Sequence, residues 1–141
     1  MVKVESFSFD NKQKFDLALS IRKEVFVKEQ CVDERLEFDG LDPVATHYLA
    51  FYNETTVGTA RWRNTEKGIK LERFAVLAPY RSKKIGIALL EAVLKDVKVF
   101  NETIYLNSQT LAIGFYLKYG FVKSGKPFFE AGIEHIKMVL K

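Results

Sequence analysis

The sequence predicts an α+β fold, a mixed α/β sheet with helices on both of its faces. Predicted strands outnumber predicted helices along the 141 residues. The second half of the chain alternates strand, helix, strand and helix, an order that implies parallel neighbouring strands. In the first half, two predicted strands follow one another through a short turn, as in an antiparallel hairpin. We therefore expect one sheet with both parallel and antiparallel pairs.

In the first half of the chain, the spacing of apolar residues predicts the helices and strands, and polar residues, glycine and proline predict where they end. Asp10 or Asn11 can cap a helix after the first strand, and apolar residues at helical spacing continue this helix. Arg22 falls on its apolar stripe as a polar interruption. A polar loop follows, then an aromatic-rich hairpin and a strand ended by a proline. The predicted elements are strand 2–9, helix 15–30, loop 31–45, and strands 46–53, 54–64 and 69–76.

The second half begins with an amphipathic helix whose apolar residues recur on one stripe. A short strand follows, then a second helix for which Gly120 is a suitable left-handed C-terminal cap. Two further strands end the chain. The predicted elements are helix 82–99, strand 103–108, helix 110–119, and strands 121–125 and 133–140.

Length and composition are those of one globular domain, residues 1–141. The chain can bury one core, and 48% hydrophobic with 28% charged residues is ordinary. A net charge of +4 suits an anionic ligand. Because the charges are scattered and many aromatic residues fall in apolar strand positions, we expect no nucleic-acid partner.

Other protein classes are disfavoured by what the sequence lacks. Cys31 is the only cysteine, so neither an internal disulfide nor a cysteine metal cluster can form. His47 and His135 lie far apart, and we expect no metal site. The first ten residues lack the apolar segment of a signal peptide, and no stretch approaches a membrane span. We therefore expect a cytoplasmic protein with no membrane partner.

A basic stretch leads directly into the helix of residues 82–99. Arg81, Lys83 and Lys84 precede Gly86 there, where the first backbone N–H groups of a helix are unpaired and attract anions. Cations beside a small residue favour a phosphate held close to the backbone. Gly86 and Ala88 would equally allow close packing of the helix on the sheet, and taken alone the two interpretations have equal weight.

Two common phosphate loops do not match this stretch. A Walker A loop is absent, and the dinucleotide fingerprint needs three spaced glycines where only Gly86 is present. The pattern that fits is Arg-x-x-x-x-Gly-x-Ala, from Arg81 to Ala88.

Residues 71–94, LERFAVLAPYRSKKIGIALLEAVL, resemble the acetyl-CoA signature of the GNAT superfamily of N-acetyltransferases. Residues 105–121, YLNSQTLAIGFYLKYGF, resemble its second signature, a strand and a helix ending in Phe-Tyr-x-x-x-Gly-Phe. Residues 21–42 and 130–138 further resemble the ElaA/YjcF-like branch. Lys84 stands where the family often has glycine, and the backbone cradle tolerates lysine there if its φ is helical.

The resemblance implies a sheet of six to seven strands that splays between two parallel strands. It implies direct acetyl transfer from acetyl-CoA to a primary amine of a small molecule or peptide, by a monomer or homodimer. Coenzyme A would contact the splayed strand, the basic helix start and the residue after the next strand. The cofactor residues are Phe74, Ala75, Val76, Arg81, Ser82, Lys83, Lys84, Ile85, Gly86, Ile87, Ala88 and Gln109.

Two residues are candidates for catalysis. Tyr116 matches the family tyrosine that can protonate the leaving thiolate; otherwise it is an aromatic residue buried with Phe115 and Phe121. Glu72, on the cofactor strand, is a candidate for the base of near-neutral pKa that takes the proton of the amine, often through water. The alternative for Glu72 is a solvated carboxylate paired with Lys70 or Arg73.

The acceptor would enter opposite the cofactor, beside the first helix and the loop after it. The polar residues there can line a pocket, although each can instead be a hydrogen-bonded structural residue. They are Arg22, Glu29, Gln30, Cys31 and, on the last strand, His135. A non-catalytic acyl-CoA-binding or sensing module on the same fold is the alternative function. Turnover with an amine library would separate the two.

Overall fold

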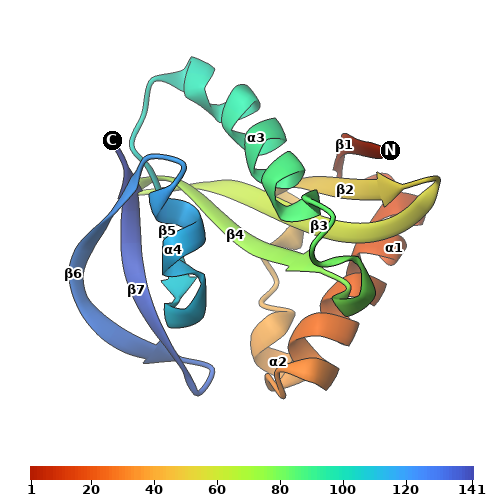
Figure 1. The fold of residues 1–141 in the computed structure, drawn as a ribbon, viewed down its shortest axis with the longest axis horizontal. Coiled ribbons are helices and arrows are strands. Elements are labelled where there is room, and N and C mark those ends of the chain that lie inside the picture. Colours follow the sequence, from red (N-terminus) through yellow and green to blue (C-terminus); the bar gives the residue numbers. More distant parts are fainter.

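The computed structural model describes residues 1–141, whose centre is a seven-stranded mixed sheet with helices on both faces (Figure 1). The strand order is β1-β2-β3-β4-β5-β7-β6, and only β4 and β5 pair in parallel. This confirms the predicted fold class. The strands are β1 (Val2–Ser8), β2 (Thr46–Tyr52), β3 (Thr55–Thr65), β4 (Gly68–Val76), β5 (Ile104–Gln109), β6 (Phe121–Glu130) and β7 (Ile133–Leu140).

The helices divide between the two faces of the sheet. The α-helices are α1 (Lys12–Arg22), α2 (Glu34–Glu37), α3 (Ile85–Val97) and α4 (Ile113–Leu117). A π-helical segment, η1 (Lys23–Glu29), continues α1, and the 3₁₀ turns are η2 (Asp42–Val44), η3 (Ala78–Tyr80), η4 (Lys98–Phe100) and η5 (Thr110–Ala112). The helix predicted over residues 15–30 is thus divided, and the predicted polar loop contains α2 and η2.

The sequence of β2 shows that both faces of the sheet are covered. Tyr48 and Ala50 pack into the core beneath α3, whereas Leu49 packs into the core beneath α1. All three are at most 1% exposed. The hairpin turns through Asn53 and Glu54, both of which have positive φ, as in the two-residue turns that suit the twist of paired strands.

The helix α3 packs closely on the sheet at Gly58. A Cβ atom on Gly58 would lie 3.1 Å from both Ile85 Cγ2 and Leu89 Cδ1. Ile85, Leu89 and Val93 of α3 are all at most 1% exposed. The missing side chain on β3 therefore fixes how closely the helix can approach. No helix of the structure has both the length and the apolar character that crossing a membrane requires.

The strand β4 bends away from β5 halfway along its length. Residues Ile69 to Leu71 pair with Ile104 to Leu106, and the parallel ladder ends there. Just beyond, β4 has one residue more than β3 between the pairs Thr59–Ala75 and Arg61–Glu72. Arg73 lies in this bulge with a φ of +59°. A bulge adds local bend and twist, and it coincides with the point where the sheet splays (Figure 1).

Candidate active site

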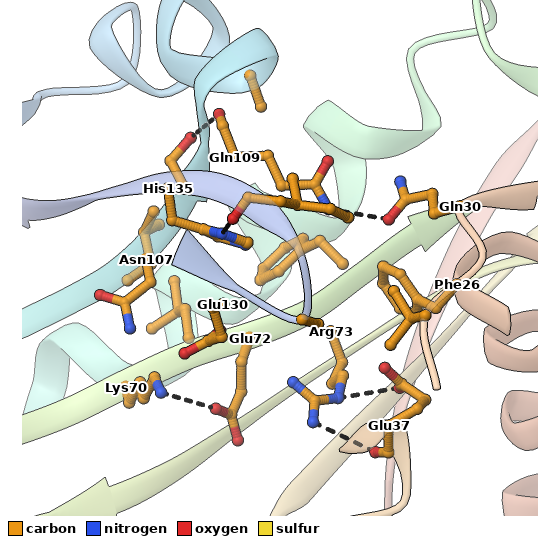
Figure 2. Close-up of a pocket in the computed structure, with 18 of the residues that line it drawn as sticks. Phe26, Gln30, Glu37, Lys70, Glu72, Arg73, Asn107, Gln109, Glu130 and His135 are labelled. Carbon is orange, nitrogen blue, oxygen red and sulfur yellow. Dashed lines mark hydrogen bonds and ion pairs between the residues drawn. The ribbon is translucent and has the colours of Figure 1, made fainter. Parts of the chain in front are cut away.

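A pocket of about 390 Å³ occupies the splay between β4 and β5. Its walls come from η1, the loop around α2, the bulged half of β4, the end of β5, α4 and the tip of the β6–β7 hairpin. Figure 2 shows polar side chains from these segments facing one another across it. Of the predicted site residues, those that line it are Gln30, Glu72, Phe74, Gln109, Tyr116 and His135.

The splayed half of β4 presents backbone groups on its open edge. Leu77 N–H donates to Val57 C=O at 2.9 Å across the Gly58–Val76 pair. The bond shows that Gly58 and Val76 form a non-hydrogen-bonded pair of the antiparallel ladder. The N–H and C=O of Val76 therefore point away from β3. The edge of the splayed strand that the family resemblance assigns to coenzyme A is therefore free of a strand partner at Val76.

Arg81 takes a role that the sequence did not indicate. Its Nε donates to Val76 C=O at 2.8 Å, and its Nη1 and Nη2 donate to Glu29 at 2.6 and 2.7 Å. As it lies here, the guanidinium is directed at Val76 and Glu29 rather than free for a phosphate. Glu29 also lies outside the pocket-lining residues, so its predicted acceptor contact is replaced by an ion pair.

The start of α3 is later and more strained than predicted. Ser82 and Lys84 have φ of +94° and +64°, and the helix begins only at Ile85. The condition under which the backbone cradle would tolerate lysine, a helical φ at Lys84, is therefore not met. The left-handed region costs a non-glycine residue about 1–2 kcal/mol, which explains why glycine suits this position. No side chain caps the helix, and its first N–H groups remain open.

Gly86 has no packing reason to be glycine. A Cβ atom there would meet nothing closer than Phe115 Cζ at 3.8 Å, an ordinary contact, and its φ is not positive. Glycine inside a helix costs about 1 kcal/mol relative to alanine. Of the two interpretations left open by the sequence, close packing loses its support at Gly86. The space beside this backbone is compatible with a phosphate.

Tyr116 lies on α4 with its ring in the core and its hydroxyl at the pocket. The residue is 8% exposed, and its ring meets Phe74 and Phe121 edge-on. The Tyr116 hydroxyl has no hydrogen-bond partner in the protein. It is not fully buried, because the only fully buried side-chain nitrogen or oxygen without such a partner is Arg73 Nε. The hydroxyl therefore reaches the pocket. Burial raises the pKa of Tyr116 well above its usual value, so the phenol stays protonated at neutral pH.

Glu72 is buried and surrounded by cations. Its Oε2 lies 2.6 Å from Arg61 Nη2 and 2.7 Å from Arg63 Nε, and its Oε1 lies 3.4 Å from Lys70 Nζ. Burial raises its pKa, but the neighbouring positive charges outweigh burial, and the net shift is downward. The near-neutral pKa expected of a base is therefore not found. Glu72 is neither solvated nor paired with Arg73, although its predicted pairing with Lys70 is present.

Arg22 is a structural residue, which corrects its predicted contact with the acceptor. It is 1% exposed and donates to Glu37 Oε2 at 2.9 Å and to Asp42 Oδ1 at 2.8 Å. Arg61 shares the same Asp42 oxygen at 2.7 Å. Pairing of this kind is what a fully buried guanidinium requires. The sequence signal for this buried ion-pair cluster was Arg22 itself, a polar residue on an apolar helix stripe. The residues that pair with Arg22 are distant in sequence, so the pattern alone could not identify them.

Gln30 and Gln109 meet across the pocket. Gln109 Nε2 donates to Gln30 Oε1 at 2.9 Å, which joins the end of β5 to the segment after η1 (Figure 2). Cys31, the next residue, is exposed and lies outside the pocket lining. Its predicted acceptor contact is therefore not supported.

His135 is held in one tautomer. Its Nδ1 lies 2.7 Å from Ile133 C=O, which can only accept, so Nδ1 carries the proton. The neutral ring then has an unprotonated Nε2, which has no hydrogen-bond partner in the protein and is not among its fully buried polar atoms. Because His135 lines the pocket (Figure 2), this nitrogen is a free acceptor there.

The polar pocket residues that the sequence interpretation did not assign to the site include Arg63, Lys70 and Asn107. The signal was available in the alternation of the strands. Lys70 and Glu72 are two residues apart on β4, and Arg61 and Arg63 are two residues apart on β3. Residues so spaced share one face of a sheet.

Comparison with known proteins gives consistent results. The family model described as "Acetyltransferase (GNAT) domain" matches residues 8–141. The chain is 38% identical over 131 residues to YjcF of Bacillus subtilis (strain 168), described as an uncharacterized N-acetyltransferase. This match covers 92% of this chain and 94% of YjcF. It is also 29% identical over 126 residues to the protein ElaA of Escherichia coli (strain K12), covering 85% and 82% of the two chains.

Solved structures share the fold. The crystal structure of Escherichia coli ElaA superposes with a TM-score of 0.90 at 24% identity and covers 100% of both chains. An aminoglycoside 6'-N-acetyltransferase complexed with coenzyme A superposes with a TM-score of 0.76 at 17% identity, covering 97% of this chain and 95% of that one.

Proposed function

This chain belongs to the GNAT acetyltransferase family, and from that premise we propose that it transfers an acetyl group from acetyl-CoA to a primary amine of a small molecule or peptide. The observation that carries the proposal is the pocket at the splay of β4 and β5, into which the unpartnered hydroxyl of Tyr116 opens. The catalytic and binding roles below are parts of this proposal.

The residues of the cofactor side fit a diphosphate. The helix α3 has no side-chain cap, and the space beside Gly86 is open. The backbone N–H groups of Ile85, Gly86 and Ile87 would hold the diphosphate, with Lys83 and Lys84 as nearby cations. Bound acetyl-CoA supplies the acetyl group as a thioester. Arg81 would have to exchange Val76 C=O for another partner if the arm of the cofactor pairs there.

Tyr116 donates a hydrogen bond rather than a free proton. A phenol with a raised pKa is a weaker acid than a thiol of pKa near 8.5. Full transfer of its proton to a thiolate is therefore unfavourable, while the O–H remains a strong donor for that anion. A donor placed where negative charge develops contributes about 3–4 kcal/mol to the transition state.

His135 is better suited than Glu72 to accept the proton of the amine. The ion pairs of Glu72 stabilise its carboxylate and so weaken it as a base. Nδ1 of His135 donates to Ile133 C=O, so Nε2 is the ring nitrogen that can accept a proton in the pocket, and imidazole is the side chain that most often serves as a general base. We therefore assign the contact with the amine to His135.

Cofactor binding and turnover test the proposal in separate steps. Acetyl-CoA at about 100 times its Kd should stabilise the protein by about 2.7 kcal/mol, measured by thermal shift. Thiol release should follow with some members of an amine library. Tyr116→Phe should keep the thermal shift and lower kcat about 100-fold.

The alternative outcomes discriminate clearly. No stabilisation by acetyl-CoA or coenzyme A would refute the proposal. Stabilisation without turnover on polyamines, amino sugars or peptides would instead favour a non-catalytic acyl-CoA sensor on the same fold.

A further inference from the structure

A basic groove adjoins the active-site pocket and opens from it. The groove has a volume of about 490 Å³ and shares Arg63, Lys70 and Asn107 with the pocket. Its charged lining residues are one carboxylate, Glu66, and four cations, Arg63, Lys67, Lys70 and Lys137. With Glu72, which contacts Arg63 and Lys70 from the adjoining pocket, four positive charges stand against two negative charges, an excess of two.

The strand register places three of these cations, Arg63, Lys70 and Lys137, on one face of the sheet. Arg63 pairs with Lys70, and Lys70 pairs with Tyr105 on β5. Asn107 follows two residues later and pairs with Lys137 of β7. Because paired residues and residues two apart project to the same side, the groove and the pocket lie along one continuous face. Like charges directly opposite one another, such as Arg63 and Lys70, destabilise a sheet.

Glu72 holds two of these cations in place. It contacts Arg63 through Oε2 and Lys70 through Oε1, and Figure 2 shows the contact between Glu72 and Lys70 beside the pocket. Arg63 uses only Nε for this bond, and its two Nη groups have no partner in the protein. Lys67 and Lys137 take part in none of the ion pairs within 4.0 Å. The groove therefore presents two cations anchored by Glu72, with the Nη groups of Arg63 still open, and two lysines without an ion-pair partner.

We propose that the acceptor amine carries an anionic group, a carboxylate or a phosphate, which binds in this groove. The proposal rests on the acetyl-transfer function proposed above and names its substrate class. Strand rise is about 3.3 Å per residue, so Lys70 lies roughly 13 Å along β4 from Phe74. An acceptor whose amine and anion are separated by on the order of 10 Å would reach from the groove to the pocket.

A nucleic-acid phosphate fits this groove less well. Single-stranded nucleic acids bind through exposed aromatic faces beside a cationic track. The one aromatic residue of the groove, Tyr105, is 6% exposed, and Lys137 Nζ lies over its ring, 5.0 Å from the centroid. The cations thus gather beside a pocket without a stacking surface for bases.

The test compares amines that differ only in the anion. The carboxylate series is 4-aminobutanoate, 6-aminohexanoate and 8-aminooctanoate, each against its carboxamide, and the phosphate arm is 6-aminohexyl phosphate against 6-aminohexanol. Hydrogen bonds to charged groups contribute about 1.5–3 kcal/mol. We therefore expect the kcat/KM of the preferred anionic amine, carboxylate or phosphate, to exceed that of its neutral counterpart about tenfold or more. Within the carboxylate series, we expect kcat/KM to pass through an optimum in chain length.

Charge-removal variants assign the effect to the groove. Lys67→Gln with Lys137→Gln should reduce the ratio of anionic to neutral kcat/KM about tenfold. These lysines make no ion pairs, so the fold should persist. Lys95→Gln with Lys98→Gln removes the same charge from exposed positions at the end of α3 and η4 and should leave the ratio unchanged.

Binding measurements keep the test independent of turnover. Calorimetric titration of 6-aminohexanoate and its carboxamide into the protein with coenzyme A should show the same preference and the same loss in the groove variant. Equal binding and turnover of both members of every pair, or a preference for the neutral members, would overturn the proposal. Failure of coenzyme A to bind would instead refute the acetyl-transfer function itself.

Discussion

His135 shows how one backbone contact can give a side chain its chemistry. The carbonyl of Ile133 accepts from Nδ1, so Nε2 is the ring nitrogen that is left to accept a proton at the pocket. Glu72 has the opposite fate, because three cations stabilise its charged form. Residue type alone would favour either as a base, and the hydrogen-bond partners distinguish them.

We expect His135→Gln to lower kcat about 100-fold at pH 7, because it removes the acceptor for the amine proton. The deficit should shrink as pH rises, since more of an amine of pKa near 10.4 is then already deprotonated. The measurement is the pH profile of kcat for both proteins, with coenzyme A binding as the control for folding. A deficit that stays constant up to pH 9.5 would show that His135 serves only in packing.

Among the secondary-structure elements, α3 involves two glycines, Gly58 beneath the helix and Gly86 in its first turn, and the absence of a side chain has a different explanation at each. Gly58 lies beneath the helix, where a Cβ atom would press against Ile85 and Leu89. Gly86 lies in the first turn, where a Cβ atom has room. Packing explains the first glycine, and the approach of a ligand is the proposed explanation for the second.

Alanine at each position should separate these reasons. Gly86→Ala should leave the free protein equally stable or up to about 1 kcal/mol more stable, yet weaken coenzyme A binding because a methyl group occupies the space beside the backbone. Gly58→Ala should destabilise the free protein by about 1–3 kcal/mol through overpacking. Denaturant unfolding with and without coenzyme A measures both effects. Unchanged affinity in Gly86→Ala would argue against a phosphate at this turn.

Across the molecule, a buried network of charged residues connects β3 and β4 to the segment around α2 and η2, on the acceptor side of the pocket. Arg61 of β3 reaches Asp39 and Asp42 near α2 and η2, and Arg73 of the β4 bulge reaches Asp39 and the backbone of Glu37. The carboxylates come from the segment 31–45, which the sequence predicted as a polar loop. Ion pairs to the sheet therefore fix the wall of the pocket that lies opposite α4.

This network predicts a loss of stability in acid. Burial raises the pKa of Asp39, but hydrogen bonds from Arg61 and Leu41 N–H and the nearby positive charges outweigh burial and lower it to about 2. A carboxylate with a lowered pKa stabilises the fold fully above its unfolded pKa, near 3.9, and this contribution is lost as pH falls toward the folded value. We expect the free energy of unfolding to fall between about pH 4 and pH 2.

The variant Asp39→Asn isolates this contribution. It should be less stable than the parent at pH 6, and the difference should shrink as pH falls toward 2. Urea unfolding at a series of pH values measures it. A difference that does not change with pH would mean that the carboxylate charge of Asp39 does not stabilise the fold.

Features that depend on short-range pattern could be predicted from the amino-acid sequence. Alternation and helical spacing predicted the order of the main elements, and the two motifs around Gly86 and Tyr116 predicted the family. Three features became visible only in the folded chain: the left-handed turn at Lys84, the pairing of Arg81 with Glu29, and the burial of Arg22 and Glu72 among opposite charges. The physical reason is that a backbone dihedral angle or a pKa is set by neighbours in space. For these residues, most of the neighbours are remote in the chain.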